Sequence, residues 1–111
     1  MSSDAGKAAE AAAARYLEAL GFRIVRRNLR GPGAEIDLVA WEGETLVFVE
    51  VKARSNRRFG GPLGAVDFRK RAKIRALAAD FLQFIATPAR VRFDVVTLER
   101  GAPRLYRGAF A

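Results

Sequence analysis

Charged side chains stand in the middle of the chain at positions where strands are usually apolar. Residues 46–52 read Leu-Val-Phe-Val-Glu-Val-Lys and end in Glu50 and Lys52, while Asp37 lies within the preceding apolar segment 36–39. Because successive side chains of a strand point to opposite faces, Glu50 and Lys52 share one face. The pattern therefore predicts two carboxylates and an amine close together on adjacent strands.

These three groups suit the hydrolysis of a phosphodiester. Two neighbouring carboxylates repel each other, and a divalent cation between them removes that penalty. Mg²⁺ (or Mn²⁺) takes hard oxygen ligands, lowers the pKa of bound water and polarises a phosphoryl oxygen, and a lysine beside it stabilises negative charge on the phosphate. The alternative is an ordinary ion pair between Glu50 and Lys52, with Asp37 beside a surface arginine. The residue pattern alone leaves both interpretations open.

The composition narrows the chemistry. The 111 residues include no cysteine and no histidine, which excludes disulfides, thiolate nucleophiles, Ser-His-Asp triads and His-based metal sites. The formal net charge is +8 and the isoelectric point is near 11.0, and basic domains of this size attract phosphate polymers or anionic surfaces. No run in the sequence approaches the roughly 20 apolar residues that cross a bilayer. We expect a cytoplasmic protein with a nucleic-acid partner and no membrane association.

The elements that position these residues are predicted from hydrophobic periodicity and from turn residues. The length predicts a single domain over residues 1–111. The order helix, three strands, helix and one or two strands predicts an α/β fold in which both helices pack on a sheet. The expected ranges are a helix over about 5–20, strands over 22–27, 35–41 and 45–53, loops over 28–33 and 54–64, a helix from 63 or 66 to 85, a strand over 91–98, and a short edge strand over 104–109.

A tight turn at Glu42-Gly43 is expected between the two central strands and sets their register. It predicts that Asp37 lies opposite Phe48 and is therefore a diagonal neighbour of Glu50. The same register puts Glu35 directly across from Glu50. Glu35 then either supports the site from the side or is simply a charge at the edge of a strand.

These motifs resemble those of the PD-(D/E)xK nuclease superfamily. Asp37 followed by Glu50-Val51-Lys52, within this order of helices and strands, is similar to the pattern of that superfamily. The match is closer to its YraN-like bacterial proteins, whose members resemble archaeal Holliday junction resolvases. The string Phe-Val-Glu-Val-Lys-x-Arg after Glu-Ile-Asp-Leu is its most specific part. The resembling segments are 6–20, 27–28, 35–38, 47–54, Val66 with Lys70, 92–95 and 109–110.

The resemblance implies a restriction-endonuclease-like fold, with a helix-strand-strand-strand-helix-strand core and a central mixed sheet flanked by helices. It implies Asp37 and Glu50 as ligands of Mg²⁺ or Mn²⁺ and Lys52 as the catalytic lysine. It also implies Glu10 as a third metal ligand and Lys70 as a further catalytic-site residue. Helical spacing places Glu10 at the edge of an apolar stripe and Lys70 toward the sheet. A solvated surface acid and a lysine that extends to water are the alternatives.

Arginine and lysine clusters flank this site along the chain and are expected to follow a phosphate backbone, with binding that weakens as salt rises. The first hypothesis is a metal-dependent DNA endonuclease with a preference for nucleic-acid structure, for which the analogy with resolvases suggests a homodimer. The others are a non-catalytic nucleic-acid-binding module that retains the nuclease fold, and a basic scaffold that binds RNA or protein. The residues expected to bind nucleic acid are Arg27, Arg30, Arg54, Arg57, Arg58, Arg71 and Lys73.

Overall fold

The computed structural model of the chain describes residues 4–54, 68–85 and 90–110. The order of elements confirms the predicted sequence of one helix, three strands, a second helix and one or two strands, and two strands follow the second helix in the structure. No helix within these ranges is long and apolar enough to cross a membrane. The elements are α1 (Asp4–Ala19), β1 (Arg23–Gly31), β2 (Ala34–Glu42), β3 (Thr45–Arg54), α2 (Phe68–Leu82), β4 (Arg90–Glu99) and β5 (Ala102–Phe110).

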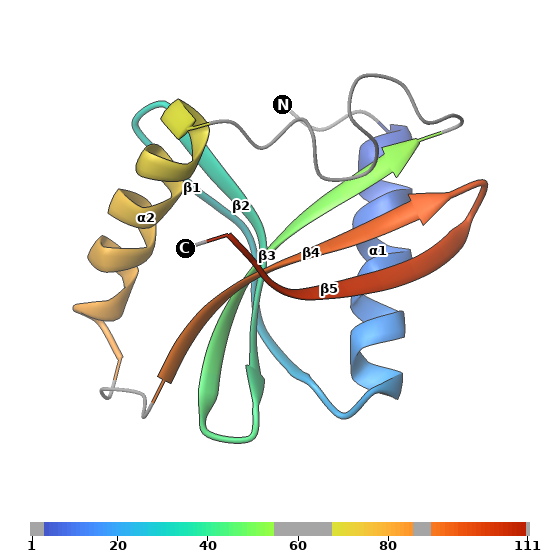
Figure 1. Cartoon of the computed structure of the whole chain (residues 1–111), viewed down its shortest axis with the longest axis horizontal. Helices are drawn as coiled ribbons and strands as arrows, with labels where there is room; N and C mark the ends of the chain where they lie inside the picture. Colours follow the sequence, from blue (N-terminus) through green and yellow to red (C-terminus); the bar gives the residue numbers. More distant parts are fainter. Residues whose placement is uncertain (1–3, 55–67, 86–89, 111) are drawn as a thin grey trace.

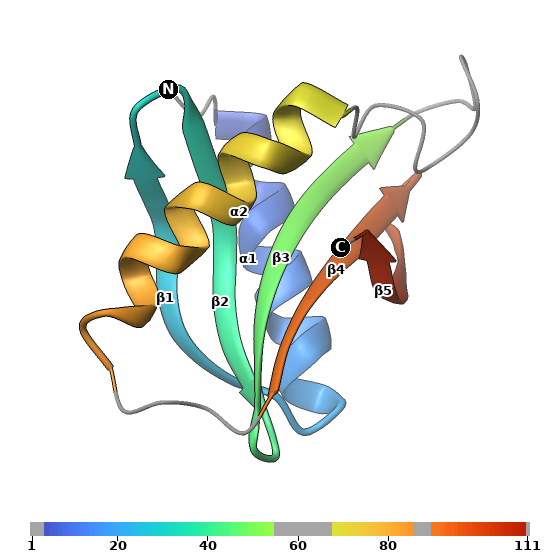
Figure 2. The same ribbon diagram turned by 60° about the vertical axis from the view of Figure 1, so that its left-hand side comes forward.

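The five strands form one sheet in the order β1-β2-β3-β4-β5. β3 and β4 are parallel, whereas the other neighbouring pairs are antiparallel, so the sheet is mixed. Helix α2 lies on one face of the sheet and α1 on the other (Figure 2). This arrangement confirms the α/β class and is consistent with a restriction-endonuclease-like core.

Strand β3 is central because its side chains fill both hydrophobic cores. Leu46 and Phe48 pack into the cluster on the α2 side, and Val47 and Val49 pack into the cluster on the α1 side. All four are at most 1% exposed. Such a strand, apolar on both faces, is typical of a position covered by helices on each side. A charged residue later on this strand therefore lies close to a dry core.

The sheet opens where β2 and β3 separate. Their pairing runs from the hairpin turn to Leu38↔Val49, whereas β1 stays paired with β2 as far as Gly31↔Ala34. On the other side, β3 stays paired with β4 to its end. β1 and β2 therefore lean to one side and β3, β4 and β5 to the other (Figures 1 and 2). We call the point of separation the fork, defined by Asp37 on β2 and Glu50 on β3.

The predicted register of the central hairpin is wrong by two residues. Glu42 pairs with Thr45, so the turn residues are Gly43 and Glu44 rather than Glu42 and Gly43. Gly43 has a φ of 61°, which glycine adopts at no steric cost and which a tight hairpin turn requires. Because the shift is two residues, the faces are unchanged, but Asp37 now follows the register toward Glu50 instead of Phe48.

Several predicted boundaries also change. β1 continues through most of the expected loop over 28–33, because Asn28 turns the backbone at a φ of 53° without ending the strand. Helix α2 ends at Leu82 rather than at 85, and its expected start lies outside the described residues. The short edge strand is a full strand of nine residues, β5.

Candidate functional site

Asp37 lies at the fork and takes the place of a missing ladder hydrogen bond. The Val51 N–H donates to Asp37 Oδ2 at 2.7 Å. The β2–β3 ladder has already ended at the pair before Asp37, so the carboxylate of one strand binds the backbone of the other. This bond holds the Asp37 side chain between the two strands and fixes its direction toward the end of β3.

Asp37 and Glu50 are in direct contact. Their carboxyl groups lie close enough to form a hydrogen bond when one of them is protonated, because an ionised carboxylate offers acceptors only. Burial, and then the hydrogen bond and the negative charge of Glu50, raise the pKa of Asp37 to about 8, although the Val51 N–H opposes the shift. Glu50 itself is only 7% exposed. The pair is the like-charge arrangement that a cation would relieve.

Helix α2 brings a lysine to Glu50, the second carboxylate of this pair. Lys70 Nζ forms an ion pair with Glu50 Oε2, so the lysine reaches the site from the first turn of α2. The spacing argument placed Lys70 toward the sheet, and the structure places it there, with its side chain still 44% exposed. Lys70 therefore contacts Glu50 while part of its side chain remains in solvent.

Lys52 lies two residues beyond Glu50 on the same face of β3 and is 9% exposed. The neighbouring parallel strand places Thr97 beside it. Lys52 lines the same cavity as Asp37 and Glu50. The structure thus brings together the three side chains that the sequence pattern singled out.

Two further carboxylates approach Asp37 from the α1 side. Oxygen atoms of Glu10, Glu35 and Asp37 all lie within 4.8 Å of one another. Glu10 is 7% exposed, so it is not a solvated surface acid. Burial, followed by repulsion from Glu35, raises the pKa of Glu10, whereas a hydrogen bond from Asn28 and the charge of Arg27 oppose the shift. Asp37 therefore lies close to Glu50 and also to the two carboxylates Glu10 and Glu35.

Asn28 is a site residue that the sequence reasoning missed. It lies opposite Asp37 on β1, between the pairs Arg27↔Leu38 and Leu29↔Ile36, and its amide hydrogen-bonds Glu10. The sequence pattern did not mark it, because its role depends on a left-handed backbone inside a strand, which asparagine tolerates better than most residues.

A cavity of about 600 Å³ opens over this cluster, between the fork and the first turns of α2. Its acidic wall is made by the carboxylates of β2 and β3, and its opposite wall by cations of α2. Four positive and three negative side chains line the cavity, so the lining has a net positive charge. An anion bound in the cavity would therefore be attracted even though carboxylates lie beside it. The charged lining residues are Glu35, Asp37, Glu50, Lys52, Arg69, Lys70 and Lys73.

The predicted nucleic-acid-binding residues do not all lie at this cavity. Lys73 lines it, and its side chain lies over Gly33 in the β1–β2 turn. Arg30 is an ion-pair partner of Glu35 at 3.4 Å, on the rim of the acidic cluster. Arg71 lies over the ring of Phe110, 5.9 Å from its centroid.

The remaining members of that predicted set are described in part or not at all. Arg27 is exposed, close enough to Glu10 for its charge to act on the pKa of that residue. Arg54 ends β3, but its side chain is not among the described parts, and Arg57 and Arg58 lie outside the described residues.

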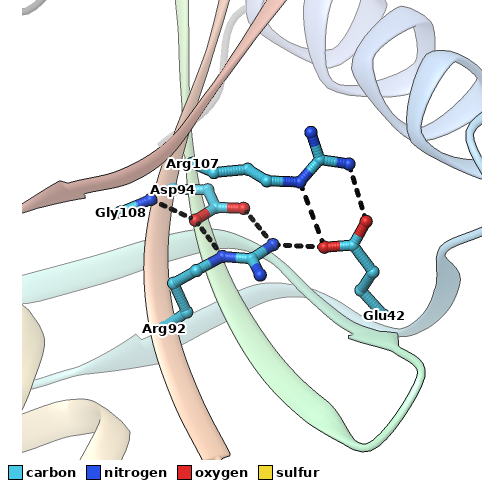
Figure 3. A network of polar contacts seen from close by, with 5 residues as sticks. All are labelled: Glu42, Arg92, Asp94, Arg107 and Gly108. Carbon is cyan, nitrogen blue, oxygen red and sulfur yellow. Dashed lines mark hydrogen bonds and ion pairs between the residues drawn. The ribbon is translucent and has the colours of Figure 1, made fainter.

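A second polar network joins β2, β4 and β5 (Figure 3). Arg92 binds Asp94 through two nitrogens at 2.8 Å and Glu42 at 2.6 Å, and Arg107 binds Glu42 at 2.6 Å. The Gly108 N–H donates to Asp94 Oδ1 at 2.9 Å, at an irregularity in the β4–β5 pairing. Asp94 is fully buried, yet each of its oxygens has a donor. We call this set the arginine network.

The fold and the fork define an α/β protein with a carboxylate and lysine cluster at the point where two central strands separate. The comparison with known families agrees with the sequence resemblance at the family level. Residues 9–98 match the family described as "Uncharacterised protein family UPF0102". The chain belongs to the UPF0102 family, whose members include the YraN-like proteins.

Relatives from distant bacteria match over most of their own length. A UPF0102 protein of Symbiobacterium thermophilum is 45% identical over 116 aligned residues, which cover 99% of this chain and 98% of the relative. A UPF0102 protein of Beutenbergia cavernae is 51% identical, covering 90% of this chain and 88% of the relative. One from Moorella thermoacetica is 49% identical, covering 84% and 78%.

Proposed function

We propose that the protein is a metal-dependent endonuclease that hydrolyses phosphodiester bonds, most directly in DNA, and that it belongs to the PD-(D/E)xK superfamily. The observation that carries the proposal is the direct contact of the Asp37 and Glu50 carboxyls beside Lys52. The cavity that contains them has a basic opposite wall, which suits a phosphate.

The donor set fits a hard divalent cation. Asp37 and Glu50 offer neighbouring carboxylate oxygens, and oxygens of Glu10 and Glu35 lie within 4.8 Å of that of Asp37. Mg²⁺ or Mn²⁺ prefers such oxygens, and the repulsion that raises the pKa of Asp37 is the penalty that a cation removes. When bound there, the ion supplies an acidified water and polarises the phosphoryl oxygen.

The side chains of the chain have separate tasks in this proposal. Lys52 is buried next to the acids, so its ammonium group is placed to stabilise negative charge that develops on the phosphate. Arg69 and Lys73 hold the flanking phosphates from the wall formed by α2. Lys70 neutralises Glu50 in the absence of substrate.

An ordinary structural ion pair explains this arrangement less well. A salt bridge that serves only the fold leaves each buried carboxylate with a cation or donor of its own, as the arginine network does for Asp94. At the fork, the Val51 N–H donates to Asp37 and Lys70 pairs with Glu50, but the two carboxyls also face each other and the pKa of Asp37 still rises. Groups with a strongly shifted pKa that line a cavity are typical of functional sites.

The test is cleavage of branched, single-stranded and duplex DNA in Mg²⁺ or Mn²⁺, with Asp37→Asn and Lys52→Met as inactive variants. Glu44→Gln, in the distant hairpin turn, is the matched control and should cleave like the wild type. Titration calorimetry with Mn²⁺ should show saturable binding that Glu50→Gln removes. Salt-sensitive DNA binding with neither cleavage nor Mn²⁺ binding would replace this proposal with the non-catalytic module.

A further inference from the structure

A second cavity, of about 360 Å³, lies between β1 and the C-terminal half of α2. Leu29, Leu77 and Phe81 give it an apolar floor, and these residues belong to the core on that side of the sheet or pack against it. The cavity therefore has a fixed base, because its floor is held in place by the same packing that attaches α2 to the sheet.

An aromatic ring stands at the mouth of this cavity. Phe84 lines it, just beyond the end of α2, and is 83% exposed. A phenylalanine this exposed loses most of the favourable free energy that burial of its ring would give. Its ring faces are accordingly available to a flat partner, which gains by covering them.

The polar groups around the ring are mainly cationic. Arg26 and Arg30 line the cavity on the β1 side, against one carboxylate, Asp80, on α2. Within the described ranges, no carboxylate forms an ion pair with Arg26. Arg30 is 54% exposed, and its partner Glu35 lines the first cavity as well. An apolar ring with flanking guanidinium groups is complementary to a nucleobase and its phosphates, because the ring can stack on the base while the guanidinium groups bind the phosphates.

The two cavities are neighbours along α2 and along the β1–β2 turn. Ile74 lines the first and Leu77 the second, so they are separated by about 5 Å of helical rise. Gly31 lines the second cavity and Gly33 the first. The backbone of Gly31 packs closely against Leu77 of α2, because a Cβ atom added at Gly31 would lie 2.7 Å from Leu77 Cδ1. A nucleic-acid strand that left the first cavity and crossed the β1–β2 turn would reach Phe84 at the second cavity.

We propose that the second cavity is a stacking subsite for an unpaired base of single-stranded nucleic acid, which leads into the candidate active site. This inference rests on the proposed function and adds the substrate class. Within a duplex, each base is covered by its neighbours, so only an unpaired base can stack on Phe84 without the cost of flipping. The preferred substrate therefore carries a single-stranded arm beside the bond to be cleaved.

Binding is measured by fluorescence anisotropy in EDTA, so that no cleavage occurs, with labelled oligothymidylate and a labelled duplex of the same length. Phe84→Ala should weaken single-strand binding about tenfold and leave duplex binding within about twofold. Phe84→Tyr should bind like the wild type, whereas Phe84→Leu should behave like the alanine variant, because only a flat ring stacks. Phe84 is exposed, so none of these variants should unfold the chain.

Phe68, the first residue of α2, provides a matched control, since it is 78% exposed but does not line the second cavity. Phe68→Ala should leave the ratio of single-strand to duplex affinity unchanged. Equal losses on both probes with Phe84→Ala, or wild-type binding by Phe84→Leu, would overturn the subsite. So would a Phe84→Ala variant that binds both probes normally and differs only in sedimentation, because the face would then be a protein interface.

The two proposals fail separately in this design. Single-strand binding that depends on Phe84, together with no cleavage in Mn²⁺, removes the nuclease and keeps the subsite. Cleavage of single-stranded and branched DNA that is equal in the wild type and Phe84→Ala keeps the nuclease and removes the subsite.

Discussion

The fork and the arginine network are built from the same kinds of residue and yet have opposite electrostatics. Hydrogen bonds from Arg107 and Arg92 lower the pKa of Glu42 to about 2. Burial and the carboxylate of Glu50 raise the pKa of Asp37 to about 8. Both clusters join strands of the same sheet, β2 and β3 at the fork and β2, β4 and β5 in the arginine network, so membership of the sheet does not explain the difference (Figure 3).

The difference lies in how completely each carboxylate is compensated. In the network, two guanidinium groups and a backbone N–H satisfy two carboxylates, and the folded state favours the charged form of Glu42. At the fork, the folded state opposes ionisation of Asp37 and so forgoes stability at neutral pH. The network is therefore expected to stabilise the fold, and the fork to serve chemistry at some cost to the fold.

The largest expected effect comes from Asp37→Asn. We expect cleavage to fall by about 100-fold or more, because the loss of even an outer partner of a metal site costs about 10- to 100-fold. The amide can still accept from Val51 and donate to Glu50, so the metal-free variant should be more stable at pH 8 than the wild type, by about 4 °C for each kcal/mol gained. Cleavage kinetics and thermal unfolding check the two halves. A variant that is inactive because it has lost stability would contradict the comparison.

The next effect is on stability and comes from Arg92→Met. Asp94 is fully buried and would lose its guanidinium partner, so we expect a loss of about 3 kcal/mol in the free energy of unfolding. Arg107→Met is the control, because Arg107 is 51% exposed and its pair with Glu42 is worth less than about 1 kcal/mol. Urea denaturation measures both. Cleavage per folded molecule should be unchanged, and a loss of it would mean that the two clusters are not independent.

The pH dependence of stability should distinguish the clusters without a large change in structure. The pKa of Asp37 rises from 3.8 to about 8 on folding. Its contribution to the free energy of unfolding is therefore fully present below pH 3.8 and is lost as the pH rises toward 8, by at most about 1.4 kcal/mol per pH unit. The pKa of Glu42 falls from 4.5 to about 2, so its contribution is complete above pH 4.5 and is lost as pH falls toward 2. Denaturation over this range, without metal, should show that the loss of stability between pH 3.8 and about 8 is smaller in Asp37→Asn than in the wild type. An identical loss would sink the assignment to Asp37.

The smallest effect is on metal affinity and comes from Lys70→Met. Lys70 places a positive charge on Glu50, so its removal should tighten Mn²⁺ binding by about two- to fivefold in the absence of nucleic acid, as expected for a partly exposed charge pair. Calorimetry measures the change, with Arg107→Met as a control that should leave Mn²⁺ affinity as it is. Weaker Mn²⁺ binding by Lys70→Met would show that the lysine supports the cation instead of competing with it.

Local chemistry was enough to predict most of the fold. The two-sided apolar pattern of β3 and the helical spacing around Ile74 gave the central strand and the second helix, because burial controls both patterns. The register of the hairpin was missed because Gly43 takes the first turn position, and Glu42 is drawn into β2, where it pairs with Thr45. That choice depends on turn geometry and on the arginines of β4 and β5, which are distant in sequence.

The site was predictable to the same extent. Asp37, Glu50 and Lys52 lie on two consecutive strands, so period-two geometry was enough to bring them together. The contributions of Asn28 and Phe84 were not predictable, since one depends on a left-handed residue inside a strand and the other on where α2 ends. The arginine network depends on contacts between residues as far apart as Glu42 and Arg107. No local pattern encodes such a pair.

The fork divides the sheet into two leaves that meet along a short seam between β2 and β3. Glu50 and Lys52 belong to the same leaf and keep their spacing whatever the seam does, whereas Asp37 is carried by the other. A small change in twist where β2 and β3 pair would therefore change the distances from Asp37 to Glu50 and to Lys52. The distance between Glu50 and Lys52 would stay the same. If the proposed function holds, the geometry that a bound nucleic acid meets at the fork would depend on the distance between the two leaves.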